Sequence, residues 1–169
     1  FAACANGAFA TDARAVIDRL PAGVGESSDL QLWAKGLWFM HSEDAERLAT
    51  VAAELRSRAA HSEARPRTVV WAAAMTAHAR AMAGDTAGAL EILEGLEPAA
   101  SRANLTWSLW DSLAQERLLL GELLVERGDT VRASEIAREF ERATPVPYLA
   151  FLPRARALSL RASTGATMA

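Results

Sequence analysis

The amino-acid sequence predicts an all-α fold, and three observations lead to this prediction. Apolar residues recur at positions i, i+3, i+4 and i+7 along most of the chain, which is the period of amphipathic helices. No sustained stretch rich in Val, Ile and Thr alternates apolar and polar residues as a strand does. Residues that begin and end helices recur between the apolar segments. Together these signals predict nine helices joined by short turns.

Length and composition indicate one folded domain. The chain has 169 residues, of which 51% are hydrophobic and 23% charged, with a net charge of −3. This is enough apolar material for a sizeable core, and it argues against intrinsic disorder. We expect one helical-repeat domain over residues 1–163 and a flexible tail over 164–169. Its antiparallel hairpins are expected at about 1–21, 28–61, 67–98 and 102–145, with a C-terminal capping helix at 148–161.

In the first expected hairpin, Thr11 begins a helix that Pro21 ends. The residues before Thr11 have the pattern of the middle of a helix, so we expect the chain to be part of a longer protein. A terminal hairpin without a neighbour exposes its apolar face, here Phe1 and Phe9. We therefore expect self-association through the N-terminal hairpin.

The second expected hairpin has two serine caps. Ser28 and Gln31 form a capping-box pattern, which predicts a helix from Ser28 to about Met40. Ser42 is the expected cap of the next helix, whose first turn is acidic and which runs to about Ala60.

Glycine and proline mark the later helix ends. Gly84 and Gly128, each followed by aspartate, are expected to stop one helix and lead into the next. Pro98 and Pro145 are expected just beyond helix ends. The remaining helices are expected over Thr68–Ala83, Ala87–Leu96, Asn104–Arg127, Val131–Ala143 and Tyr148–Arg161.

The second helices of the hairpins align with one another. We place Ala13, Ala45, Ala89 and Ala133 at the same point, at spacings of 32, 44 and 44 residues. A small residue there lets the second helix approach the first closely. The residues three, four and seven positions later are expected to pack: Val16, Ile17 and Leu20; Leu48, Ala49 and Ala52; Ile92, Leu93 and Leu96; Ile136, Ala137 and Phe140.

About half of the chain resembles the tetratricopeptide-repeat family. The best match is the set Leu120, Gly121, Leu124, Gly128, Asp129, Ala133 and Pro145, although Arg117 stands where the family has Trp. A second match comprises Thr76, Ala77, Gly84, Asp85, Ala89 and Leu93, with the terminal proline shifted to Pro98. Two intervals exceed the family's 34-residue period, so the repeats would be lengthened. The C-terminal part is also similar to the last repeats of large bacterial regulators.

This resemblance implies a right-handed α-solenoid of about four hairpins plus the capping helix, with a concave ligand-binding face. When Ala77 is set opposite Gly121, the family register predicts a groove for a partner. Its residues are Trp71, Ala74, His78, Ala81, Gln115, Leu118, Glu122 and Val125. An alternative stays open, in which Trp71 and Leu118 simply pack between hairpins.

No pattern of catalytic or metal-binding residues stands out. His41, His61 and His78 lack the i, i+4 spacing of a helical metal site, and Cys4 is the single cysteine. We expect His41 and His61 to lie at helix ends, and His78 to be a satisfied or groove-lining side chain. We therefore expect no catalytic residue, no metal and no cofactor.

Charge occurs in bands along the chain. Residues 56–80 carry five arginines against one glutamate, 85–129 carry nine acids against three arginines, and 132–161 carry six arginines against three glutamates. Such bands favour a partner of complementary charge. A nucleic-acid groove would need a basic excess over the whole domain, so we expect no nucleic-acid binding by this segment.

The sequence thus predicts a non-enzymatic protein-protein interaction module that binds a peptide or partner protein on its concave face. One alternative is a structural spacer in a larger assembly, and another is an enzyme with a pocket between repeats. No stretch reaches the roughly 20 apolar residues of a membrane span. A single cysteine is compatible with a reducing compartment, so we expect a cytoplasmic location.

Overall fold

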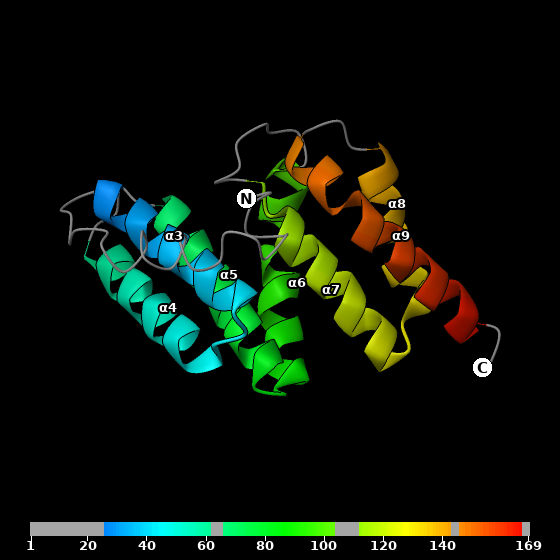
Figure 1. Cartoon of the computed structure of the whole chain (residues 1–169), viewed down its shortest axis with the longest axis horizontal. Coiled ribbons are helices and arrows are strands. Elements are labelled where there is room, and N and C mark those ends of the chain that lie inside the picture. The colour runs from blue at the N-terminus through cyan, green and yellow to red at the C-terminus, as the bar shows by residue number, and fades with distance from the viewer. Residues whose placement is uncertain (1–25, 62–65, 104–111, 143–145, 167–169) are drawn as a thin grey trace. The chain divides into compact units, whose positions relative to one another are not determined.

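The computed structural model describes residues 26–61, 66–103, 112–142 and 146–166, and it confirms the all-α prediction for them (Figure 1). These residues form seven helices and no strand. The helices are α3 (Glu26–His41), α4 (Ala45–Ala60), α5 (Pro66–Met82), α6 (Thr86–Ala103), α7 (Ala114–Arg127), α8 (Thr130–Arg142) and α9 (Val146–Ala166). The expected hairpin over 1–21 lies outside the described residues, and so do Cys4, Phe1 and Phe9.

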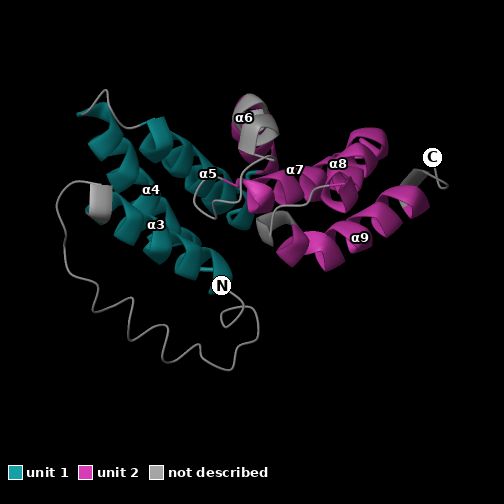
Figure 2. Cartoon of the chain, turned by 90° about the horizontal axis from the view of Figure 1, so that it is seen from above, with its two compact units in different colours: residues 1–85 teal, residues 86–169 magenta. Residues whose placement is uncertain are grey.

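The chain divides into two compact units (Figure 2). Unit 1 ends at Asp85 and unit 2 begins at Thr86. The boundary falls between α5 and α6, the two helices of the hairpin expected over 67–98. The single-domain organisation and that hairpin therefore stay predictions, and each unit is described by itself.

The described residues of unit 1 form an array of three helices around one core. α3 and α4 are antiparallel, because Arg58 near the end of α4 bonds Ser28 and Asp29 near the start of α3. α5 packs on both helices. The core contains Leu32, Trp33 and Met40 of α3, Leu48, Val51, Ala52 and Leu55 of α4, and Trp71, Ala72, Met75 and Ala79 of α5. Burial of these apolar side chains is the main stabilising contribution to unit 1.

Gly36 brings α3 and α5 close together. A Cβ atom added at Gly36 would overlap the side chain of Met75. Gly36 and Met75 have the same separation in sequence as Asp29 and Thr68, which are hydrogen-bonded at a spacing of 39 residues. The two contacts follow one another along both helices, so α3 and α5 are parallel.

Unit 2 repeats this arrangement. α7 and α8 are antiparallel, because Arg117 in the first turns of α7 pairs with Glu139 near the end of α8. α9 packs on both helices, and α6 packs on α7. Gly121 of α7 is the point of close approach, because a Cβ there would lie 2.5 Å from Cδ2 of Leu158 and 3.3 Å from Cγ2 of Ile136.

The two units share one register. Asp44 and Asp129 precede α4 and α8, and each carboxylate accepts a hydrogen bond from the backbone N–H three residues later, at 3.1 and 3.2 Å. Gly36 and Gly121 each stand eight residues before the aspartate. The buried residues then correspond in order: Leu48, Val51, Ala52 and Leu55 in α4, and Ala133, Ile136, Ala137 and Phe140 in α8.

This register corrects the alignment expected from sequence. Ala133 corresponds to Leu48 and not to Ala45, and Ala49, which we expected to pack, is exposed. Ala89, the third alanine of the expected alignment, does correspond to Ala133. It is fully buried and lies four residues after Asp85, as Ala133 lies four residues after Asp129. Burial on a helix is decided by its whole apolar face, and the expected alignment placed α4 about one helical turn away from the observed register.

The prediction that Ser28 and Ser42 cap the helices of the second hairpin is wrong. α3 begins at Glu26, so Ser28 lies inside the helix and is buried. Ser42 belongs to the end of α3, since its Oγ donates to the carbonyl of Trp38 at 3.0 Å. Asp44 is the cap of α4. Serine and aspartate are almost equally good caps, so the local sequence did not separate Ser42 from Asp44.

Several later boundaries also differ from expectation. α6 continues through Pro98 to Ala103, because a proline weakens a helix by removing one donor without always ending it. α7 begins at Ala114; residues 104–111 lie outside the described part, and Leu113 has a left-handed backbone with φ 45°. α9 reaches Ala166, so residues 164–166 of the expected tail are helical.

Gly84 and Gly128 behave as predicted. Their φ angles are 82° and 89°, the left-handed region that glycine adopts without a Cβ clash. The N–H of Gly128 donates to the carbonyl of Val125, and that of Asp129 donates to the carbonyl of Leu124. These glycines end α5 and α7 and start the turns to the following helices.

Candidate interaction surfaces

The α5 half of the predicted groove is largely buried. Trp71, Ala74 and His78 are less than 9% exposed, and Ala81 is half-buried. The ring of Trp71 lies 5.8 Å from that of Trp33, centroid to centroid, within the core of unit 1. Its position fits the alternative reading, in which this tryptophan packs between helices.

The α7 half is more accessible. Gln115, Glu122 and Val125 are half-buried, whereas Leu118 is fully buried and again fits the packing alternative. Both carboxylate oxygens of Glu122 accept hydrogen bonds from Nη2 of Arg154 in α9, at 3.0 and 3.1 Å. Half of the predicted groove therefore belongs to one unit and half to the other, and the continuous groove stays a prediction.

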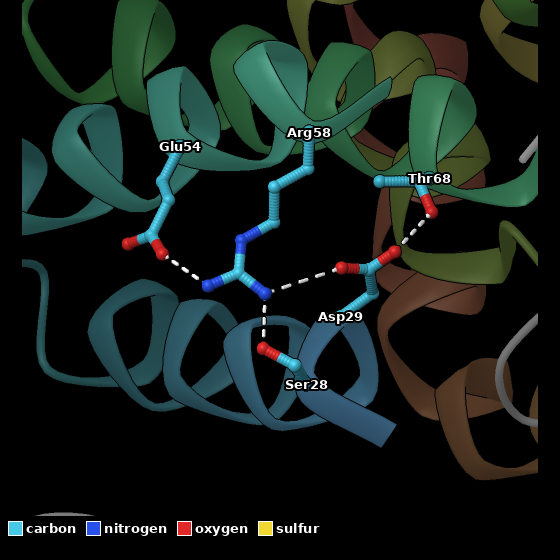
Figure 3. Close-up of polar contacts among 5 residues, drawn as sticks. All are labelled: Ser28, Asp29, Glu54, Arg58 and Thr68. Carbon is cyan, nitrogen blue, oxygen red and sulfur yellow. Dashed lines mark hydrogen bonds and ion pairs between the residues drawn. The ribbon is translucent and has the colours of Figure 1, made fainter. Parts of the chain in front are cut away.

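A polar cluster centred on a buried aspartate joins the three helices of unit 1 (Figure 3). We call Ser28, Asp29, Glu54, Arg58 and Thr68 the Asp29 cluster. Asp29 is fully buried, and its Oδ2 accepts a hydrogen bond from Oγ1 of Thr68 at 2.9 Å. Its Oδ1 lies 3.5 Å from Nη1 of Arg58. Asp29 also stands near the N-terminus of α3, where the helix dipole favours a negative charge.

Arg58 connects the Asp29 cluster to solvent. Its guanidinium donates to Oγ of Ser28 and, at 2.5 Å, to Oε1 of Glu54, whose side chain is half exposed. The carboxylate and the guanidinium thus satisfy one another inside the unit. Buried polar groups that are paired in this way position helices relative to one another.

Sequence analysis did not find the Asp29 cluster. We read Ser28 and Asp29 as the start of a helix, where polar residues are common. One sequence feature could have indicated the cluster: Arg58 lies three residues after the buried Leu55 and therefore on the same face of the helix. A charged residue on an apolar helix face needs a partner of opposite charge.

In unit 2 the bands of opposite charge pair with each other. Glu94 of α6 accepts hydrogen bonds from Arg132 at 3.0 Å and from Arg127 at 3.4 Å. The hydrogen bond from Arg132 is the main reason why the pKa of Glu94 lies below its ordinary value. Together with the Glu122–Arg154 pair, these contacts pair charged residues within unit 2. From the sequence we expected the same charges to bind a partner protein.

The histidines do not converge on a site. His41 and His61 lie at helix ends as expected: His41 ends α3 near the ring of Trp38, and His61 follows α4. Nδ1 of His61 lies 2.6 Å from the carbonyl oxygen of Ser57. Among the residues that the structure describes, no three His, Cys, Asp or Glu side chains are grouped so as to hold a metal ion. No helix in the described part of the chain has the length and apolar character of a membrane span.

In the part of the chain that the structure describes, every regular element is a helix and one three-helix arrangement occurs twice. Comparisons of the chain with protein-family models, curated proteins and solved structures give no match. The likeness to tetratricopeptide repeats therefore rests on the sequence pattern described above.

Proposed function

We propose that the protein is a non-enzymatic protein-protein interaction module that binds a peptide or partner protein on the surface of its stacked helical hairpins. The observation that supports this is the repeated register of the two units. Gly36 and Gly121, Asp44 and Asp129, and the buried residues of α4 and α8 correspond at a constant separation of 85 residues.

Repetition of this kind favours a solenoid. One hairpin cannot bury its apolar face alone, so each needs the next as a neighbour. Stacked hairpins present an extended surface that suits a peptide or a partner helix. Within this proposal the hairpins form the right-handed α-solenoid that the sequence resemblance implies, inside a larger bacterial protein of the cytoplasm.

The accessible part of the proposed binding face lies on α7. Gln115, Glu122 and Val125 are half-buried, and they stand near the spacing of one helix face. Leu118 is fully buried and supports this face from below rather than touching the partner, whereas Trp71 belongs to the core of unit 1. Substitutions that test binding should therefore be made on α7 and not at Trp71, whose loss would disturb the core.

A structural spacer is the second candidate. The internal ion pairs of unit 2 favour it, because they join α6 to α7 and α8, and α7 to α9. A spacer would have no ligand of its own, whereas an interaction module binds its partner when no other domain is present.

The test is affinity capture from native bacterial lysate with the whole chain as bait, read by mass spectrometry. The binding variant combines Gln115→Ala with Val125→Glu. The matched control is Val131→Glu, at an exposed valine of α8. We expect a partner captured by the wild type and the control but not by the binding variant. No captured partner favours the spacer, and a partner retained by the binding variant rules out the α7 face.

A further inference from the structure

α9 has apolar residues on two faces, of which one is covered. Between residues 149 and 164, the buried residues are Ala155, Leu158 and Ala162, which lie on one side of the helix. The corresponding third helix of unit 1, α5, has eight buried residues between Thr68 and Ala79. α9 thus buries fewer residues than α5, and part of its apolar surface is exposed to solvent.

The exposed apolar residues of α9 are aligned. Leu149 is 47% exposed, Leu160 is 69% exposed, and Pro153 is exposed between them. Their spacings of four and seven residues place them on one helix face. Pro153 has no N–H to donate to the carbonyl of Leu149, and the helix tolerates this because water reaches that face.

Arginines border this line. Arg156 and Arg161 are exposed and lie on either side of Leu160, and neither pairs with a carboxylate among the described residues. Arg154, the third arginine of α9, is neutralised by Glu122. The sequence of α9 contains no Asp or Glu, so two cations next to the exposed leucines are uncompensated on the helix.

We propose that this face docks an acidic amphipathic helix of a partner protein. We call Leu149, Pro153, Arg156, Ala157, Leu160 and Arg161 the α9 outer face. Leucines of the partner would pack along the Leu149–Leu160 line, and its flanking carboxylates would pair with Arg156 and Arg161. The charge of the face selects an acidic partner and disfavours a basic one. The inference rests on the proposed interaction function and gives that function a second surface with a defined ligand chemistry.

A second copy of the chain is a poorer occupant. Two α9 outer faces brought together by a two-fold axis would oppose arginine to arginine, with like charges repelling. An anionic membrane has the right charge, but a helix lying on a membrane usually carries a broad apolar face with larger side chains than alanine and proline.

The experiment measures binding of a fluorescein-labelled synthetic peptide to the full chain by fluorescence anisotropy. The peptide is a helix of about 20 residues with leucines along one face and glutamates beside them. A second peptide has lysine in place of each glutamate. The variants are Leu160→Glu and the pair Arg156→Glu with Arg161→Glu, all at exposed positions, and circular dichroism checks that helicity is kept.

Val69→Glu and Arg47→Glu are the matched controls, because both are exposed residues of unit 1. We expect the acidic peptide to bind the wild type and both controls, with at least about tenfold weaker binding to each α9 variant. Binding should also weaken as salt is added, because the arginines are exposed. The lysine peptide should not bind.

Three results would overturn the proposal. The first is equal binding of the two peptides. The second is acidic-peptide binding, or its absence, that is the same for wild type and α9 variants. The third is an α9-dependent dimer in sedimentation, or α9-dependent binding to phosphatidylserine vesicles, without peptide binding. The lysate capture on α7 is unaffected by any of these results, so a failure at α9 is distinguishable from a failure of the interaction function.

Discussion

Replacing Gly121 by alanine tests the close packing of α7 against α9 and α8. The new Cβ would lie 2.5 Å from Cδ2 of Leu158, which is nearly fully buried, and 3.3 Å from Cγ2 of Ile136. Forcing one extra methyl into a packed core costs about 1 to 3 kcal/mol. Alanine also favours a helix over glycine by about 1 kcal/mol, which offsets part of that cost.

Gly95 separates these two effects. It lies in α6, is exposed, and a Cβ added there would meet nothing within 4 Å. Gly95→Ala should therefore raise the free energy of unfolding by about 0.5 to 1 kcal/mol through helix propensity alone. Since the propensity gain is common to both variants, the difference between them equals the overpacking cost at Gly121. We expect Gly121→Ala to be less stable than Gly95→Ala by about 1 to 3 kcal/mol.

The assay is urea denaturation followed by far-ultraviolet circular dichroism, with the midpoint and slope compared among wild type and the two variants. An unchanged slope shows that the same transition is measured in each. If Gly121→Ala proved as stable as Gly95→Ala, α7 and α9 would not approach as closely as described.

Three further substitutions can be checked by the same denaturation assay. Thr68→Val removes the hydroxyl that donates to buried Asp29 and should lower the free energy of unfolding by about 1 to 3 kcal/mol, since the carboxylate loses a partner. Gly128→Ala should destabilise by about 1 kcal/mol because φ is 89° there, whereas Gly95→Ala, with ordinary helical geometry, should not. Glu94 has a lowered pKa in the fold, so its pairs stabilise above its ordinary pKa of 4.5 and are lost as pH falls through the folded value. Glu94→Gln should therefore cost up to about 1 kcal/mol at pH 7 and less at pH 2, and an equal loss at both pH values would contradict this.

The local features of the fold were predictable from sequence. Glycine at 84 and 128 ended helices where expected, because a left-handed residue after an apolar helix has a strong local signal. The apolar faces of α6 and α8 were also predicted, since Ala89, Leu93 and Ile136 are buried as their spacing required.

Features that depend on distant residues were missed. The partner of Asp29 is Thr68, 39 residues away, and nothing near either residue in sequence indicates the pair. The helix caps were predicted wrongly for a related reason. Ser42 and Asp44 have similar local propensities, but in the fold Asp44 accepts the N–H of Arg47 whereas Ser42 donates to the carbonyl of Trp38 in α3. The predicted groove combined α5 with α7, and the family register did not indicate that Trp71 is part of the core of unit 1.

The Asp29 cluster has a consequence for the choice among alternative packings. Apolar attraction is not directional, so a position of α5 one helical turn away along α3 would still bury part of the same apolar surface. A slip of α5 by one turn would carry Thr68 about 5.4 Å away from Asp29 and leave a buried carboxylate with poorer partners. The carboxylate adds little net stability, because its desolvation offsets most of its attraction to Arg58. Its effect is to make the wrong positions costly, so that the core of unit 1 has one preferred arrangement.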